Sequence, residues 1–305
     1  MTPKPNFFIV GAPKCGTTAM YTYLKVHPDV FMPYEKEPHF FATDLRARRY
    51  ERYRSLEAYL ALFADAKSEK RVGEASVLYL YSRVAAHNIR EFDPAAKIII
   101  MLRNPVDTLY SFYGQLVYSG EEDIATFDGA LAAEPDRKQG RRLPAGMIGA
   151  VDCLYYREMV RFAGQVQRYF DVFGRDAVHI IIYDDFQADT MAAYRETLKY
   201  LDIDPGFTVE LKVINQNKRP RNLAMRDFLK NPPDWYVSLL RVGRATVPQP
   251  LRHGITRSLA RINSQVEPRR PMDRVLRQQL QAEFLPEVER LSTVLDRDLT
   301  HWCAN

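Results

Sequence analysis

The segment 7–18 constrains the fold of this 305-residue chain more than any other. An apolar run, Phe7–Val10, leads into a loop with Gly11 and Gly16, and a predicted helix over 17–26 follows. A loop of this kind directs several backbone N–H groups toward one point, and the helix N-terminus adds partial positive charge. The segment therefore predicts a phosphate-binding turn at the end of a buried strand.

The loop reads GAPKCGTT, and its lysine is displaced from the position that it has in the nucleoside-triphosphatase loop GxxxxGK[ST]. The two glycines have the right spacing, but Thr17 follows Gly16, and the lysine lies earlier, at Lys14. A lysine inside the loop is better placed for a short diphosphate-like chain, and the hydroxyls of Thr17 and Thr18 add donors. A kinase or NTPase that uses ATP and magnesium is the first alternative, and the position of Lys14 argues against it. A tight left-handed turn with a surface lysine is the structural alternative.

Strands and helices alternate after this loop, which favours an α/β fold. The continuous apolar runs Lys97–Leu102 and Val178–Ile182 are typical of strands that are buried on both faces. Helical spacing of apolar residues predicts helices over 53–65, 82–91, from 105, 154–172 and 273–297. We expect a single domain over 1–305, with a central parallel sheet flanked by helices and an arginine-rich helical insertion over 225–270.

Composition limits the partners and the compartment. The net charge of +5 and the pI of about 9.0 suit an anionic ligand, an anionic polymer or a membrane surface, without choosing among them. The three cysteines lack disulfide and metal-site spacing, which indicates a reducing, cytoplasmic compartment. No apolar run reaches 18 residues, so we expect a soluble protein without a transmembrane segment. We expect no metal and no nucleic-acid partner; the sequence does not give the oligomeric state.

A second candidate phosphate contact follows the strand 97–102. Arg103 lies at the carboxyl end of this strand, where α/β proteins bind ligands. Asn104 is suited to cap the next helix and Pro105 to begin it. Ser111 lies two turns further on, and an arginine fork with a serine hydroxyl can hold a phosphate. The alternative is an arginine at a strand end and a serine on a solvated helix face.

Both motifs together resemble the sulfotransferase family that uses 3'-phosphoadenosine-5'-phosphosulfate (PAPS). PKCGTTAMYTYL resembles its 5'-phosphosulfate loop, and IIIMLRNPVDTLYSFY resembles its 3'-phosphate motif. The resemblance spans nearly the whole chain, through KEPHFF (36–41), GEASVLYLY (73–81), IIIYDDF (180–186), NQNKRPRN (215–222) and DRDLTHW (296–302). It implies the P-loop NTPase-like sulfotransferase fold and transfer of a sulfuryl group from PAPS to an acceptor hydroxyl or amine. Adenosine 3',5'-bisphosphate (PAP) is then the product.

The resemblance also implies the nucleotide contacts. Those expected at the 5'-phosphosulfate are Lys14, Cys15, Gly16, Thr17 and Thr18, and those at the 3'-phosphate are Arg103 and Ser111. The loop with Lys218, Arg219 and Arg221 resembles the third nucleotide contact, although the usual glycine after the basic residue is absent. Tyr183, after the strand 178–182, is expected near the nucleotide, and Asp184 and Asp185 are expected in a turn rather than at a metal. Cys15, beside a helix N-terminus, is expected to have a lowered pKa or to be a passive loop residue.

Glu37 is the predicted general base. Its segment resembles the E-x-H-F-F segment of the heparan-sulfate-type branch, whose matching glutamate is the base, and His39 is the alternative base or an orienting partner. Pro38 favours an extended Glu37, and an apolar wall of Phe40 and Phe41 would raise the pKa of its carboxyl group. The structural alternative is a surface carboxylate paired with a basic neighbour.

Lys14 is predicted to stabilise the departing phosphate while the base takes the acceptor's proton. Cytosolic small-molecule members use a later histidine as base, and His87, in a polar helical segment, is no clear counterpart.

The acceptor is less constrained. The heparan-type 3-O-sulfating enzymes carry a lysine where this chain has Ala75, so their specificity does not carry over. Ser76 and Gln115 are candidate acceptor contacts, and packing or surface polarity explains both equally well. A carbohydrate, a glycolipid, a phenol or a small metabolite fits, and peripheral membrane contact is compatible with the charge. A nucleotide- or glycan-binding homologue without catalysis is the second alternative.

Overall fold

The computed structural model describes residues 3–211, 218–222, 225, 264–266 and 270–304. The chain divides into two compact units. The first unit comprises 1–112, 148–214 and 272–305, and the second comprises 113–147 and 215–271. The phosphate loop, Glu37 and Arg103 all belong to the first unit.

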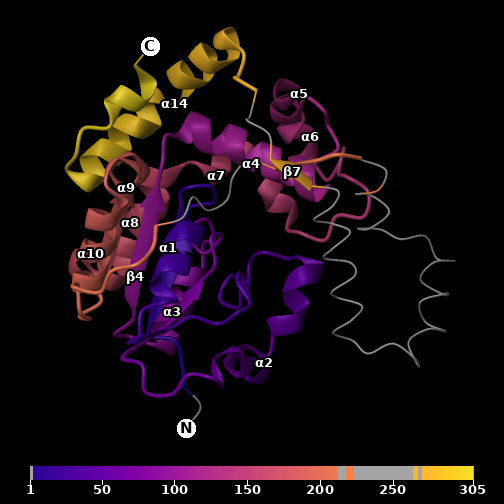
Figure 1. Cartoon of the computed structure of the whole chain (residues 1–305). Coiled ribbons are helices and arrows are strands. Elements are labelled where there is room, and N and C mark those ends of the chain that lie inside the picture. Colours follow the sequence, from indigo (N-terminus) through magenta and orange to yellow (C-terminus); the bar gives the residue numbers. More distant parts are fainter. Residues whose placement is uncertain (1–2, 212–217, 223–224, 226–263, 267–269, 305) are drawn as a thin grey trace, which may run out of the picture. The chain divides into compact units, whose positions relative to one another are not determined.

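The first unit is built on a five-stranded parallel sheet in the order β2-β3-β1-β4-β5. Figure 1 shows β4 of this sheet with helices beside it. The strands are β1 (Phe7–Gly11), β2 (Val30–Phe31), β3 (Arg71–Ala75), β4 (Lys97–Leu102) and β5 (Val178–Ile182). The predicted α/β fold with a central parallel sheet is therefore confirmed. The short β2 gave no distinct apolar run in the sequence.

The central strands are buried on both faces, as their continuous apolar runs predicted. Every residue of Phe7–Val10 and of Ile98–Leu102 is inaccessible to solvent. In β3, Gly73 makes room for this core, because a Cβ atom there would lie 2.1 Å from Phe7 Cζ and 2.4 Å from Met32 Sδ. A side chain at position 73 would therefore displace the ring of the neighbouring central strand.

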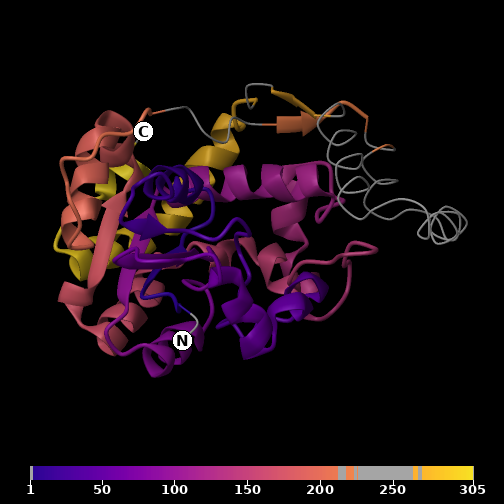
Figure 2. The same ribbon diagram turned by 60° about the horizontal axis from the view of Figure 1, so that its bottom comes forward.

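Helices cover both faces of this sheet (Figure 2). The long ones are α1 (Thr17–Leu24), α3 (Ala85–Phe92), the first part of α4 (Pro105–Ser119), α8 (Phe162–Phe173), α10 (Thr190–Tyr200) and α14 (Arg274–Leu295). α1 packs with α10 through the edge-to-face rings of Tyr23 and Tyr194, whereas α3 packs against α8. Right-handed β-α-β connections place such pairs on opposite faces of a parallel sheet.

Two predicted helices are shorter than their apolar patterns. The segment 154–172 contains α7 (Tyr156–Met159) and α8, which are separated by two residues, because Glu287 of α14 accepts a hydrogen bond of 2.8 Å from Ala163 N and caps α8 from outside. The segment 53–65 contains α2 (Leu56–Leu60), which Ser55 caps and which continues into a 3-10 turn, η2 (Ala61–Phe63). A partner that is distant in sequence sets the first boundary, so local spacing could not predict it.

The last helix confirms the prediction over 273–297 closely. Asp273 caps α14 by accepting a hydrogen bond of 3.0 Å from Leu276 N, and Pro286 lies inside the helix without ending it. α14 packs against α8, and Arg157 before α8 pairs with Glu283 at 2.6 Å. Within the described residues, no helix has both the length and the apolar character needed to span a membrane.

The second unit contains the end of α4, α5 (Phe127–Ala132), α6 (Glu134–Lys138) and an antiparallel pair, β6 (Lys218–Pro220) and β7 (Ser264–Val266). Arg137 and Glu122 form a fully buried pair there, with two hydrogen bonds of 2.7 Å. Two short helices thus replace the loop with one helix that is expected over 120–150. Most of the insertion predicted over 225–270 lies outside the described residues, and the single domain over 1–305 stays a prediction.

Candidate active site

The phosphate loop has the predicted strand–loop–helix form. α1 begins directly after Gly16, whose φ of 91° is in the left-handed region. A Cβ atom at Gly16 would lie 3.2 Å from Met101 Cε and 3.3 Å from both Tyr183 and Phe186, so glycine is required by conformation and by space. The loop is tied to the neighbouring strand by Ala12 N, which donates to Met101 O at 2.7 Å.

Lys14, Thr17 and Thr18 differ in how far they are exposed at this turn. Lys14 has a φ of 64° and is half-buried. Thr17 is buried, and Thr18 is half-buried at the start of the helix. The loop therefore presents a lysine and a threonine hydroxyl at a partly accessible turn, which is the arrangement that an anionic ligand needs.

Cys15 is the exception, because its thiol pKa is not lowered and its burial favours the alternative of a passive loop residue. Its side chain is fully buried, with Sγ 3.4 Å from Pro13 O and 3.7 Å from Thr108 Oγ1. Burial raises the pKa of the Cys15 thiol to about 12, and this outweighs the opposing effects of Thr108 and Arg103. Cys15 therefore contributes its backbone and its packing to the loop rather than a reactive side chain.

Arg103 lies at the carboxyl end of β4, beside the loop. Its guanidinium group lies 4.6 Å from the centre of the Tyr183 ring, and its Nη2 lies 3.9 Å from Asp107 Oδ2. Asn104 caps α4 as predicted, because its Oδ1 accepts a hydrogen bond of 2.9 Å from Val106 N. Ser111 is buried two turns into α4, on the same helix face as Asp107.

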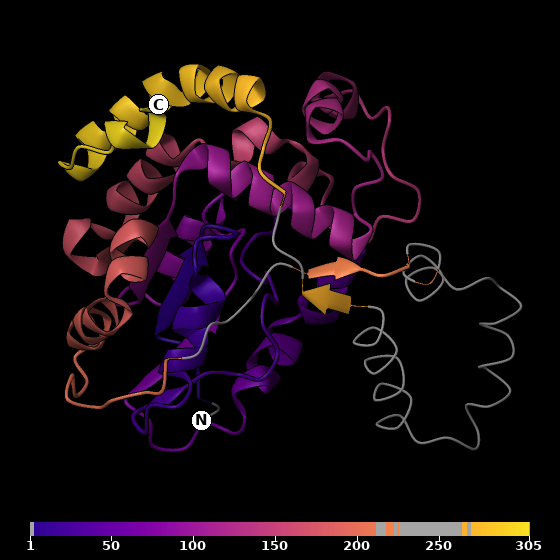
Figure 3. The same cartoon turned by 45° about the horizontal axis from the view of Figure 1, so that its top comes forward.

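The C-terminal segment supports this side of the site, although DRDLTHW (296–302) gave no indication of these contacts. Arg277, in the first turn of α14, donates to Asp107 Oδ1 at 2.8 Å, and Asn104 Nδ2 donates to Trp302 O at 2.7 Å. Figure 3 shows the ribbon of α14, in yellow, beside that of α4. Trp302 Nε1 in turn donates to Asp184 Oδ2 at 2.6 Å. Asp184 thus lies in the first turn of α9 (Tyr183–Ala188), not in the expected turn, and its neighbour Asp185 pairs with Arg297.

The segment with Glu37 is held against the end of β3. Glu37 N donates to Ala75 O at 3.0 Å, and His39 N donates to Ser76 Oγ at 3.1 Å. Glu37 has a φ of 61° rather than the extended conformation expected before Pro38, because its amide is fixed to the strand end. Ser76 is fully buried and faces the backbone of this segment.

Glu37 and His39 form the centre of the segment. Glu37 Oε2 lies 3.5 Å from His39 Nε2; the carboxylate side chain is 40% exposed and the imidazole only 2%. Burial lowers the pKa of His39, against the effect of Glu37, so the ring is neutral near pH 7. Its Nδ1 is buried without a hydrogen-bond partner among the described residues, which fits a proton on Nε2, facing Glu37.

The pKa of Glu37 is lowered, and the expectation that it is raised is wrong. Burial alone raises this pKa, but the interactions with His39, Lys36 and Arg49 together outweigh that effect. The expected apolar wall does not form, because Phe40 stacks on Tyr59 at 4.3 Å and Phe41 N donates to Tyr79 Oη at 3.3 Å. Glu37 is therefore an ionised, partly exposed carboxylate at neutral pH.

Two charged residues at this site, Lys36 and Glu74, lie in the segments KEPHFF and GEASVLYLY but were not among the predicted site residues. Lys36 Nζ donates to Thr18 Oγ1 at 2.9 Å and lies 5.1 Å from the centre of the Tyr21 ring. Glu74 is fully buried in β3, and burial raises its pKa to about 7. Glu74 Oε2 accepts hydrogen bonds from Tyr79 and Tyr59 at 2.7 and 3.2 Å.

Three of the predicted contacts belong to the second unit rather than the first. Gln115, Lys218 and Arg219 belong to the second unit, the latter two in β6. Their roles toward the nucleotide and the acceptor stay predictions. Among the described residues, no three histidine, cysteine, aspartate or glutamate side chains gather into a group that could hold a metal ion.

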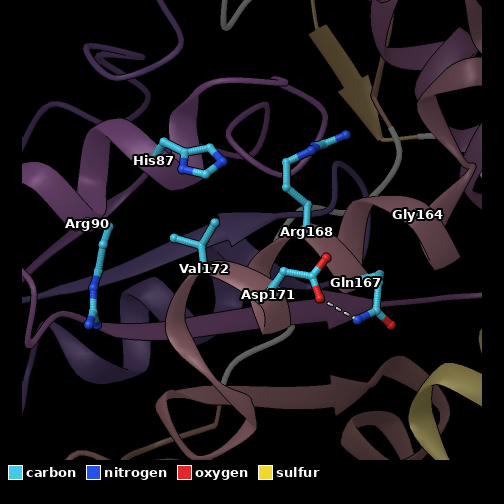
Figure 4. Close-up of a pocket in the computed structure, with 7 residues that line it drawn as sticks. All are labelled: His87, Arg90, Gly164, Gln167, Arg168, Asp171 and Val172. Atoms are coloured by element: carbon cyan, nitrogen blue, oxygen red, sulfur yellow. Dashed lines mark hydrogen bonds between the residues drawn. The ribbon is translucent and has the colours of Figure 1, made fainter.

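A shallow pocket lies elsewhere, between α3 and α8 (Figure 4). Arg168 on its wall donates to Ser82 O at 2.8 Å, and Gln167 donates to Asp171 at 2.7 Å. Its lining residues are His87, Arg90, Gly164, Gln167, Arg168, Asp171 and Val172. His87 thus lies on the exposed side of α3, at this pocket.

Comparison with known proteins gives matches over most of the chain. The sequence profile of the family described as "Sulfotransferase domain" matches residues 4–219. Human carbohydrate sulfotransferase 15 is 33% identical over 150 residues, which cover 36% of this chain and 27% of that protein. Human heparan sulfate glucosamine 3-O-sulfotransferase 6 is 36% identical over 111 residues, which cover 36% of this chain and 30% of that protein.

Among solved structures, the crystal structure of a sulfotransferase from Alicyclobacillus acidocaldarius superposes with a TM-score of 0.72. It is 31% identical, and the match covers 98% of this chain and 99% of that one. The matches to the two human relatives, by contrast, span less than a third of the length of each relative.

Proposed function

Because this chain belongs to the sulfotransferase family, whose members use PAPS as donor, we propose that its phosphate loop and Arg103 bind PAPS and that Glu37 activates the acceptor. The sulfuryl group then passes to a hydroxyl or amine of the acceptor. Lys14 is the predicted partner of the departing phosphate. The single observation that carries the proposal is the convergence of a phosphate loop, an arginine and an ionised carboxylate at the carboxyl ends of adjacent strands.

The donor half of the proposal rests on strand pairing. β1 and β4 are neighbours, and Gly11 pairs with Ile100, so the loop after β1 and Arg103 after β4 emerge side by side. A ligand with phosphate groups at both ends of a nucleoside fits such a pair of contacts. The loop suits the 5'-phosphosulfate through its N–H groups, Lys14 and Thr18, and Arg103 with Ser111 suits the 3'-phosphate.

The acceptor half rests on the state of Glu37. A carboxylate that is ionised and 40% exposed can accept a proton from an incoming hydroxyl, and His39 beside it is neutral and holds its orientation. In the proposed step, the acceptor oxygen or nitrogen attacks sulfur and its proton passes to Glu37. The bond from sulfur to the bridging oxygen breaks, and its electron pair remains on the 5'-phosphate of PAP. Lys14 and the loop N–H groups stabilise that charge.

A carbohydrate or a glycolipid is the acceptor class that we propose. Support comes from the names of the two human relatives, one a carbohydrate sulfotransferase and one a heparan sulfate glucosamine 3-O-sulfotransferase. Ala75 stands where the 3-O-sulfating enzymes carry a lysine, so a specific sugar position is not part of the proposal. A cytoplasmic location and peripheral membrane contact stay predictions from the sequence.

Calorimetry and a labelled donor test the proposal together. Titration with PAP measures the nucleotide site, and sulfur-labelled PAPS with pooled acceptors, followed by mass detection, measures transfer. In the variant Glu37→Gln, PAP should bind as in the wild type while transfer falls by at least about a hundredfold, as expected for removal of a general base. Glu35→Gln, two residues earlier in the same segment, is the matched control and should leave both readouts unchanged.

Each possible result supports or excludes one of the alternative functions. A wild-type protein without affinity for PAP contradicts the donor site. Full transfer by Glu37→Gln shows that Glu37 is not the base and directs attention to His39. Binding of PAP without transfer to any acceptor, in wild type and variant alike, favours a nucleotide-binding homologue without catalysis.

A further inference from the structure

Lys36 connects the two halves of the proposed site. Its ammonium group donates a hydrogen bond of 2.9 Å to the hydroxyl of Thr18, at the start of α1. The next residue along the chain is Glu37, whose charge acts on the ammonium group. The Tyr21 ring, 5.1 Å away, supports the same group from the helix side. Lys36 therefore lies between the phosphate loop and the predicted base.

The ammonium group retains unused hydrogen-bonding capacity. Within the described part of the chain, Thr18 Oγ1 is the only hydrogen-bond acceptor of Lys36 Nζ, so two of its three N–H bonds have no acceptor among those residues. Thr18 Oγ1 accepts the bond from Lys36, so its own proton can be donated elsewhere. Two donor groups thus stand together at the rim of the phosphate loop.

Because Lys36 is partly buried, leaving its N–H bonds without acceptors costs free energy. Burial lowers the pKa of the Lys36 ammonium group, and Glu37 only partly opposes this effect. A cation that is partly removed from water and incompletely paired is stabilised when an anionic group binds to it.

We propose that Lys36 is a second cationic contact to the donor, and that it holds the sulfuryl group itself between Thr18 and Glu37. The inference rests on the proposed function. It follows from the order of groups in an in-line transfer, in which the leaving phosphate, the sulfuryl group and the acceptor with its base stand in one line. In the proposed complex, Lys14 and the loop contact the phosphate, and Glu37 contacts the acceptor. A lysine that contacts Thr18 and adjoins Glu37 lies beside the group between them.

In this position, Lys36 acts on the charge of the three sulfuryl oxygens, while Lys14 acts on the oxygen that leaves with the phosphate. The two lysines have separate tasks, so their removal should have separate signatures. Loss of a phosphate contact weakens PAPS and PAP together. Loss of a sulfuryl contact weakens PAPS and leaves PAP nearly unchanged, because PAP lacks the sulfuryl group.

The test is calorimetric titration of PAPS and PAP, without acceptor, into the wild type, Lys36→Met and Lys36→Arg. A hydrogen bond to a charged group that is lost should weaken PAPS by about tenfold or more in Lys36→Met and PAP by less than about threefold. Lys36→Arg keeps the charge and should recover part of the loss. Lys25→Met is the matched control, because Lys25 also lies near the Tyr21 ring, at 5.6 Å, and its only described hydrogen-bond acceptor is Tyr21 Oη.

The outcomes distinguish this inference from the function on which it rests. If the wild type binds neither PAP nor PAPS, the proposed function fails. If the wild type binds both and Lys36→Met weakens both equally, Lys36 merely supports the loop through Thr18, and the inference is overturned. An unchanged affinity for PAPS overturns it as well. Should Lys36→Met fail to fold, as judged by circular dichroism, Lys36→Gln is compared in its place by the same ratio of affinities.

Discussion

Arg277 donates a hydrogen bond of 2.8 Å to Asp107, whose other carboxylate oxygen lies 3.9 Å from Arg103. One carboxylate thus faces two guanidinium groups, one from α14 and one from the end of β4. The contact with Arg277 is the shorter by more than 1 Å, so Asp107 is largely occupied by the C-terminal helix. Arg103, which is stacked on Tyr183, is left available to an anionic ligand.

The variant Arg277→Ala should therefore weaken nucleotide binding without touching the predicted ligands. Asp107, released from α14, is expected to pair with Arg103 and to compete with the 3'-phosphate. We expect the affinity for PAP to fall about fivefold, the size of a partly exposed ion pair, and the affinity for adenosine 5'-monophosphate to change little. Calorimetry with both nucleotides measures the difference, because only PAP carries the 3'-phosphate.

Arg290→Ala is the control for this prediction, because Arg290 lies on the same helix and pairs only with Glu287 among the described residues. It should bind both nucleotides as the wild type does. An equal loss of both nucleotides in Arg277→Ala, with a lower melting temperature, would show instead that Arg277 only holds α14 in place.

The state of Glu37 predicts the pH dependence of transfer. The pKa of Glu37 is lowered from its ordinary value of 4.5, so the base is deprotonated above that pH and becomes protonated only as the pH falls through the lowered pKa. Between about pH 5.5 and 8, protonation of Glu37 should therefore not change the ratio kcat/KM for the acceptor. In Lys36→Met, one of the charges that lower this pKa is absent, and the acidic limb of the profile should move upward.

Stopped-time assays with the labelled donor over this pH range check the profile. An acidic limb near pH 6 in the wild type would be inconsistent with an ionised Glu37 as the base. The pKa of His39 is lowered from 6.5. If the acidic limb of the pH profile disappears in His39→Asn but persists in Glu37→Gln, the group that accepts the acceptor's proton is the imidazole of His39.

The sequence predicted the parts of the site that depend on local chain geometry. The loop around Gly16 and the cap at Asn104 are set by residues within a few positions of one another, so their spacing is readable. The continuous runs of β1 and β4 are likewise local, and they placed the loop and Arg103 at the same edge of the sheet. Local patterns were sufficient there because strand pairing follows from α/β topology.

The sequence could not predict contacts made by segments far apart in the chain. Arg277 is 170 positions from Asp107, and no motif marks it among the many arginines of its region. The error about the pKa of Glu37 has the same origin, because the placement of Phe40 against Tyr59 is decided by packing and not by adjacency to Glu37.

The burial of Cys15 predicts its reactivity. A thiol that is fully buried, with a pKa of about 12, should resist alkylation in the folded protein, whereas Cys303 is partly exposed and should react. Mass spectrometry after brief treatment with iodoacetamide at pH 8 should find label at Cys303 and none at Cys15, and unfolding in urea should open both. Rapid labelling of Cys15 in the native state, blocked by PAP, would indicate instead that the loop opens to solvent.

Glu74 predicts a dependence of stability on pH that can be removed by one substitution. Its pKa is about 7 in the folded protein and near 4.5 when exposed, so the folded state binds the extra proton, and stability is lost as the pH rises from 4.5 through 7. Glu74→Gln keeps the shape of the side chain and cannot ionise. The difference between its free energy of unfolding and that of the wild type should therefore shift in favour of the variant by up to about 3 kcal/mol from pH 5 to pH 8. Urea unfolding at both pH values measures this gain, with the exposed pair of Glu196 and Lys199 supplying the control Glu196→Gln. A difference between Glu74→Gln and the wild type that is the same at both pH values would mean that Glu74 is ionised throughout, held by Tyr59 and Tyr79 as a buried carboxylate.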